Sequence, residues 1–226
     1  MAQMFGRALN IPFPRNRLPV LRSCIMLGHY LNPRNMKNVV IVWRDGRDII
    51  VSYYYHSLFE FDIGGNTLLV KKSREDLKFN DYHDIRSNLP KFIEYVFTVK
   101  RSPRFSWADF VEKWYNREGV IYVKYEDLRV DAVKELQRVV KELTGKKLSK
   151  ENAQSIVDEF SFKKQAGRKP GQEKRDSILR KGIVGDWKNH FTQAARERFD
   201  YYAGEYLIKL EYEQDRQWVT NEKTLS

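Results

Sequence analysis

The chain has 226 residues, of which 42% are hydrophobic, and it contains no internal repeat, so a folded globular protein is expected rather than a disordered one. No apolar run reaches the ~20 residues that span a bilayer, and residues 1–16 lack the apolar stretch of a signal peptide. Cys24 is the single cysteine, which excludes an intramolecular disulfide and favours a reducing, cytoplasmic location.

The first half of the chain contains one clear strand-to-helix unit. Residues 39–43 form a continuous apolar, β-branched run that predicts a buried parallel strand. A polar turn is predicted at residues 44–48, and apolar residues at helical spacing predict a helix over 49–59. The following segment, 68–104, is polar and irregular except for a predicted helix at 89–100.

The second half repeats the alternation of strands and helices. Ser106 with Asp109 is typical of a helix start and predicts a helix over 107–116, before a second strand at 120–125. Asp131 and Ser149 each predict a cap for a further helix. A long helix is predicted from about 192 to 210, followed by a frayed polar tail over 211–226 with Trp218 as an anchor.

This order predicts an α/β fold for one domain, residues 1–226, in which helices flank a parallel sheet in three layers. Two strong strands are too few for such a sheet. A strand is therefore missing, or is hidden in a weaker segment such as 18–26.

The net charge of +11 is concentrated in part between residues 163 and 181. An anionic partner is expected: nucleic acid, a membrane surface or an acidic small molecule. Glycines and a proline interrupt the stretch, so it is interpreted as a loop that either folds over a phosphate or is a solvated surface loop. Its basic residues are Lys163, Lys164, Arg168, Lys169, Lys174, Arg175, Arg180 and Lys181.

Arg44 and Ser52 form a second candidate anion site. Ligands of parallel sheets bind beyond the carboxyl ends of the strands, where Arg44 is placed. Ser52 follows eight residues later, about two helical turns on, so both side chains could reach one phosphate. The alternative is a surface turn held by salt bridges among Asp45, Arg47 and Asp48.

Several motifs in the same order resemble the cytosolic-type sulfotransferases, which use 3′-phosphoadenosine-5′-phosphosulfate (PAPS). Residues 180–192, Arg-Lys-Gly-Ile-Val-Gly-Asp-Trp-Lys-Asn-His-Phe-Thr, resemble the family's C-terminal signature. Residues 44–54 resemble its 3′-phosphate motif, with Gly46 where the family usually has proline. The resemblance covers about residues 19–212 and includes Ser106-Trp107, Trp114 and Tyr125-Glu126-Asp127-Leu128. It implies a P-loop-like parallel sheet flanked by helices.

The resemblance also implies roles for particular residues in transferring a sulfuryl group from PAPS, with 3′,5′-adenosine bisphosphate (PAP) as product. Tyr125 would hydrogen-bond the adenine and Phe162 would stack on it, although Ile178 replaces an aromatic residue common in the family. No metal-binding motif is present. The 3′-phosphate would be bound by Arg44, Ser52, Arg180, Lys181 and the backbone N–H of Gly182.

His29, fifteen residues before Arg44, matches the family's catalytic base, which takes a proton from the acceptor. The family usually has Lys-Ser/Thr before this histidine, where this chain has Leu27-Gly28. His56 and His83 are interpreted as structural or exposed, and His190 has no assigned chemical role.

The family's N-terminal loop, of the type Pro-Lys-Ser-Gly-Thr-Thr-Trp, is not found among residues 1–28. That loop binds the 5′-phosphosulfate, so the chain is expected to lose a central strand and most transferase activity. A truncated start and a degenerate relative that binds nucleotide without catalysis both explain this. Three functions are considered, in this order: an enzyme of this family, an inactive scaffold and a nucleic-acid binder. A kinase or P-loop NTPase is not supported, because the motif Gly-x-x-x-x-Gly-Lys-Ser/Thr is absent.

The acceptor is expected to be a hydroxyl of a small molecule or glycan, recognised partly by residues 60–104. A homodimer is also considered, because Lys188, Thr192 and Glu197 match the family's dimerisation segment. Gln193 replaces the valine of that segment, which weakens the apolar contact.

Overall fold

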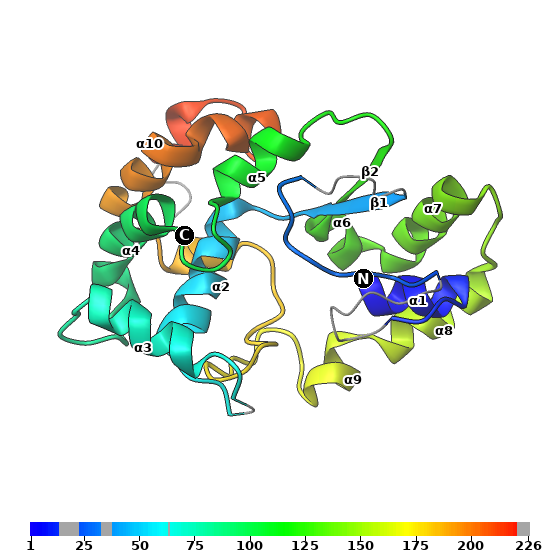
Figure 1. Cartoon of the computed structure of the whole chain (residues 1–226), viewed down its shortest axis with the longest axis horizontal. Helices are drawn as coiled ribbons and strands as arrows, with labels where there is room; N and C mark the ends of the chain where they lie inside the picture. Colours follow the sequence, from blue (N-terminus) through cyan, green and yellow to red (C-terminus); the bar gives the residue numbers. More distant parts are fainter. Residues whose placement is uncertain (14–22, 33–37, 63, 221–226) are drawn as a thin grey trace. The chain divides into compact units, whose positions relative to one another are not determined.

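A parallel pair of strands lies in one of two units into which the chain divides. The protein is known from a computed structural model that describes residues 1–13, 23–32, 38–62 and 64–220 (Figure 1). The first unit comprises residues 1–43 and 116–170, and the second comprises 44–115 and 171–226. Whether these units are one folding domain stays a prediction.

The first unit contains strands β1 (Val39–Trp43) and β2 (Val120–Lys124), which pair in parallel as the sequence predicts. The register aligns Val39 with Val120 and Trp43 with Lys124. Trp43 stacks on Tyr122, with ring centroids 5.7 Å apart, which adds a cross-strand contact to the ladder. The helices of this unit are α1 (Ala2–Leu9), α6 (Tyr125–Val130), α7 (Ala132–Thr144), α8 (Lys150–Glu159) and α9 (Phe162–Ala166).

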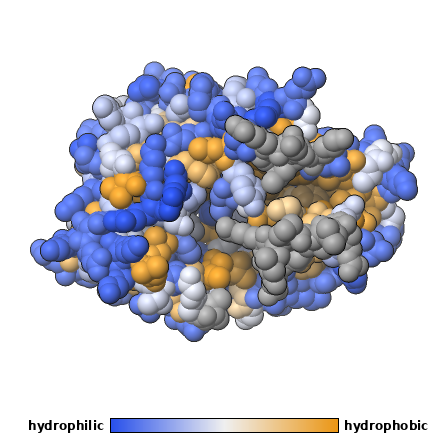
Figure 2. All heavy atoms as spheres, in the orientation of Figure 1, coloured by the Kyte–Doolittle hydropathy of each residue, from blue (hydrophilic) through white to orange (hydrophobic). Residues whose placement is uncertain are grey.

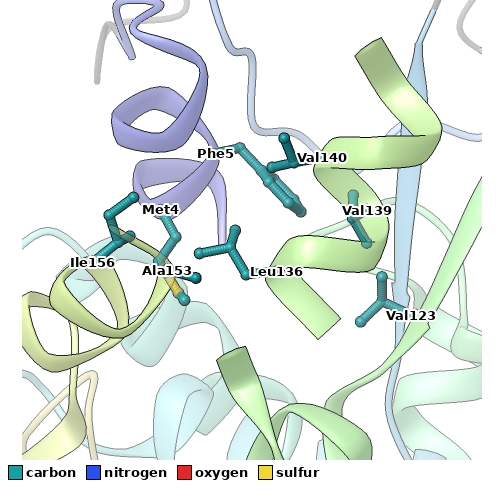
Figure 3. Close-up of a cluster of buried hydrophobic side chains, with 8 residues drawn as sticks. All are labelled: Met4, Phe5, Val123, Leu136, Val139, Val140, Ala153 and Ile156. Atoms are coloured by element: carbon teal, nitrogen blue, oxygen red, sulfur yellow. The ribbon is translucent and has the colours of Figure 1, made fainter. Parts of the chain in front are cut away.

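The core of the first unit is a cluster of apolar side chains from α1, β2, α7 and α8 (Figure 3). Leu136, Val139 and Val140 lie on the face of α7 that the sequence predicts to be apolar, and all three are buried. Met4 and Phe5 of α1 point into the same cluster, together with Val123, Ala153 and Ile156. Asp131 and Ser149 cap α7 and α8 as predicted, by accepting from the amides of Lys134 and Asn152.

The second unit is helical in its described residues. Its helices are α2 (Gly46–Leu58), α3 (Thr67–Asp76), α4 (Ile85–Val99), α5 (Trp107–Trp114) and α10 (Gln193–Lys209), with short 3₁₀ turns η1 (Asp186–Asn189) and η2 (Arg216–Val219). Helix α10 packs against α4 and α5, and α2 packs against α3, α4 and η1. The predicted Ser106–Asp109 capping box of α5 is confirmed in both directions.

Several predicted boundaries in the second unit are wrong. Helix α2 begins at Gly46, inside the predicted turn, because the Asp45 side chain accepts from the Arg47 amide and starts the helix early. Asp84 caps α4 in the same way, so that helix begins at Ile85 and contains Pro90. Helix α3 was not predicted from the sequence, and only Val70 and Ser73 of it are buried, too few for a visible apolar stripe.

Other corrections concern the ends of elements and the tail. Tyr125, predicted to end β2, is the first residue of α6, and α1 was not predicted. The tail is ordered as η2 around Trp218, which is buried and anchors it as expected, while 221–226 lie outside the described residues. A weak strand was suggested at residues 18–26. Residues 18–22 also lie outside the described residues, and residues 23–26 do not form a strand. The first residues of the predicted basic loop, 163–166, are helical and belong to α9.

The surface agrees with the high charge of the chain. On the face drawn in Figure 2, hydrophilic residues predominate and hydrophobic residues gather in separate patches. In the described residues, no helix has both the length and the apolar character that crossing a membrane requires.

Candidate functional site

The start of α2 is fastened to the segment that precedes α10. Asp48 is 1% exposed, and its carboxylate accepts from the backbone amides of Gly185 (2.8 Å) and Trp187 (3.0 Å). Arg44, at the carboxyl end of β1, lies 3.7 Å from the same carboxylate. Burial raises the pKa of Asp48, against the opposing effects of Arg44 and the two amides. The predicted turn is therefore part of a buried junction and not a surface salt-bridge turn.

Asp186 organises the basic residues of the C-terminal signature. It is 2% exposed and accepts from Arg180, from Lys181 Nζ at 2.6 Å and from Asn189 Nδ2 at 3.0 Å. His190 Nε2 lies 3.5 Å from its carboxylate. Burial opposes the charge of Asp186, but the hydrogen bonds from His190, Arg180, Lys181 and Asn189 outweigh it and hold its pKa well below the usual value.

One pocket of the second unit brings together three of the predicted site residues. Arg44, Ser52 and Arg180 line a cavity of about 240 Å³. Two guanidinium groups and a hydroxyl form a donor set suited to an anion. The cavity is completed mainly by aromatic and apolar side chains: Ile49, Tyr53, Tyr55, His56, Phe61, Ser177 and Ile178.

Arg180 is held from several sides. Its guanidinium carbon lies 4.5 Å from the ring centroid of Tyr55, and its two terminal nitrogens donate to Glu173 and Asp186. Lys181, the next residue, also donates to Asp186. Gly182, which follows it, has a backbone φ of +66°. A left-handed conformation of this kind is one that glycine adopts without strain.

The remaining predicted site residues belong to the first unit. His29 is exposed and lies outside the helices and strands. Tyr125 and Phe162 are half-buried first residues of α6 and α9, and the guanidinium of Arg168 lies 5.4 Å from the Phe162 ring. These three residues and the pocket residues are thus carried by different units.

Sequence reasoning missed part of the second-unit site. His56, interpreted as structural or exposed, lines the pocket between Tyr53 and Phe61, and burial lowers its pKa. The spacing of Ser52 and His56 by one helical turn could have indicated this. Asp48 and Asp186 occur in the family motifs, but the sequence did not predict that they bind the neighbouring cations and amides. In the described residues, no group of three or more His, Cys, Asp or Glu side chains could hold a metal ion.

The model of the sulfotransferase domain family matches residues 25–211, and the chain therefore belongs to the sulfotransferase family. The resemblance of its motifs to this family is confirmed. Transfer of a sulfuryl group is the reaction of the family as a whole.

Among individual proteins, the chain is similar to sulfotransferase 1E1 of Cavia porcellus, with 29% identity over 72% of this chain and 52% of that protein. Human sulfotransferase 1C2 is 33% identical over 59% of this chain and 51% of that protein. The chain thus spans about half the length of the curated relatives it matches. Mouse sulfotransferase SULT7A1, solved as a complex with PAP, superimposes with a TM-score of 0.55 at 21% identity, covering 76% of this chain and 61% of that one. This likeness confirms the α/β sulfotransferase fold.

Proposed function

We propose that this chain binds PAPS and PAP, and that the pocket beside α2 holds the 3′-phosphate. The observation that supports the proposal most is that Arg44, Ser52 and Arg180 line one cavity. A doubly charged phosphate needs several fixed donors, and two arginines with a hydroxyl supply them.

Lys181 and Gly182 extend this proposed donor set along the chain. Lys181 follows Arg180 in the chain, and both side chains donate to Asp186. Gly182 has no side chain to obstruct an approaching ligand, and its positive φ is compatible with a backbone N–H turned to an anion. The family resemblance assigns both residues to the same phosphate.

For the transfer step we propose His29 as the base. Its imidazole would take the proton of an acceptor hydroxyl while the oxygen bonds to sulfur and the bond between sulfur and the PAP oxygen breaks. Tyr125 and Phe162 would bind adenine, as the family resemblance implies. The acceptor is proposed to be the hydroxyl of a small molecule or glycan.

Turnover by these 226 residues alone is proposed to be slow. Position 28, where the family has Ser or Thr, is glycine, and a Cβ built there would lie 2.1 Å from the Tyr30 ring. A hydroxyl-bearing residue would fit only if that ring moved. With no lysine at position 27 and no phosphosulfate loop in residues 1–28, charge on the leaving oxygen would lack its usual stabilisation. Robust turnover with PAPS and a panel of phenols and sugars would refute this part.

The test is calorimetric titration with PAP at low and moderate salt. We expect micromolar binding that weakens by about tenfold or more in Arg44→Ala and Arg180→Ala, since each removes a charged donor. Arg104→Ala, which removes an exposed arginine of the same unit, is the control and should bind as the unchanged chain does. A folded chain that ignores PAP but binds DNA with steep salt dependence would replace this proposal with the nucleic-acid reading.

A further inference from the structure

Arg180 has two carboxylate partners, one exposed to solvent and one buried. Its Nη2 donates to Asp186, whose side chain is 3% exposed, and its Nη1 donates to Glu173, whose side chain is 26% exposed. The two acids therefore hold opposite ends of one guanidinium, one inside the protein and one at the edge of solvent.

Asp186 is fixed on all sides by the protein. Besides Arg180 it accepts from Lys181 and Asn189, and the amide of the next residue, Trp187, is bonded to the buried Asp48. The Trp187 ring is itself covered by Arg47, whose guanidinium lies 3.8 Å from the ring centroid. Asp186 thus belongs to a rigid arrangement that aligns two neighbouring cations.

Glu173 is held opposite Arg180 by a short backbone pairing. The Gly171 amide donates to the Lys181 carbonyl at 2.8 Å, and the Lys174 amide donates to the Arg180 carbonyl at 2.9 Å. The Glu173 carboxylate also accepts from Arg175 Nε at 3.3 Å. A carboxylate between two arginines beside the Tyr55 ring occupies a position that suits an anionic ligand.

The loop that carries Glu173 is fixed by its neighbours rather than by Glu173. Lys174 pairs with Asp62, and the Asp62 amide donates to the Asp176 carbonyl at 3.2 Å. The backbone can therefore stay in place while the Glu173 side chain turns away into solvent.

We propose that the two acids have opposite effects on the anion site: Asp186 positions Arg180 and Lys181 for the ligand phosphate, whereas Glu173 is a built-in competitor that occupies Arg180 Nη1 until the phosphate displaces it. This inference rests on the proposed function, because it takes the 3′-phosphate of PAP as the ligand of Arg180. It predicts opposite signs for two substitutions that each remove one negative charge from the same arginine.

The experiment compares E173Q and D186N by calorimetry with PAP, with adenosine 5′-monophosphate, which lacks the 3′-phosphate, and with inorganic phosphate. E173Q should raise the affinity for PAP by about three- to tenfold, and D186N should lower it by about tenfold or more. Both effects should be absent with adenosine 5′-monophosphate. E75Q, which removes a charge from exposed α3, is the matched control and should change PAP affinity by less than about twofold.

The outcomes separate this inference from the proposed function. PAP binding that E173Q leaves unchanged or weakens would overturn the competitor role while the nucleotide site stands. PAP affinity that D186N leaves unchanged, in a chain shown to be folded by near-UV circular dichroism, would overturn the positioning role. If D186N does not fold, the direction in which E173Q changes the PAP affinity decides whether the proposal stands. Binding of neither PAP nor phosphate by any variant would overturn both proposals.

Discussion

The apolar core of the first unit and the charged cluster of the second are built on different physical principles. Leu136, Val139 and Val140 lie among other apolar side chains, where shape and volume decide the energy. Asp48 and Asp186 are as deeply buried, but each is surrounded by donors from Arg44, Arg180, Lys181 or backbone amides. The first arrangement tolerates exchange of one hydrocarbon for another. The second depends on particular charges, and it borders the pocket proposed to bind the ligand.

The largest effect is expected in the apolar core. Leu136→Ala should reduce the free energy of unfolding by about 2–5 kcal/mol, because it removes a fully buried side chain and leaves a cavity. Val130→Ala, at a position that is 88% exposed in the same unit, should change it by less than about 0.5 kcal/mol. Urea denaturation monitored by circular dichroism measures both. Equal effects of the two substitutions would show that the described core does not carry the stability of this unit.

The charged cluster should respond to pH, as the apolar core does not. Asp186→Asn should cost about 1–3 kcal/mol at pH 7, since buried donors lose a charged acceptor. The folded state lowers the pKa of Asp186 from 3.8, so its stabilising effect is complete above that value and is lost as the pH falls toward the folded-state pKa. The stability difference between the unchanged chain and D186N should therefore shrink as the pH falls below about 4.

Asp48, in the same cluster, should change the stability with pH in the opposite direction to Asp186. Burial raises its pKa, so protonating it favours the folded state as the pH falls through the folded-state value toward 3.8. Urea denaturation of the unchanged chain, D186N and D48N across this pH range separates the two groups. A difference between the unchanged chain and D186N that stays constant down to about pH 2 would contradict the assigned role of the Asp186 charge.

The same contrast explains what the sequence could predict. The strands predicted at 39–43 and 120–125 follow from continuous apolar runs, and the apolar face of α7 follows from helical periodicity, because buried hydrocarbon leaves both patterns in a sequence. Long motifs identified the family and pointed to Arg44, Ser52 and Arg180, which do line one pocket. The partners of those cations were not predictable, because Glu173 reaches Arg180 through a local backbone pairing that has no sequence period. Helix α3 was not predictable either, because it is mostly exposed and its sequence has no apolar period.

The smallest effect is expected where the charged motif meets aromatic packing, at Gly46. A Cβ at this position would lie 2.7 Å from the Trp107 ring and 2.9 Å from Phe199, so the space of the family's proline is filled by aromatic side chains. Gly46→Ala should destabilise the chain by about 1 kcal/mol, because the overpacking cost of ~1–3 kcal/mol is partly offset by the ~0.4–1 kcal/mol gained when alanine restricts the unfolded chain. In urea denaturation, adding Ala to a Trp107→Leu background should cost less than adding it to the unchanged chain, because the contact with the Trp107 ring is then gone while that with Phe199 remains. Additive effects of the two substitutions would mean that Trp107 does not impose glycine at this helix start.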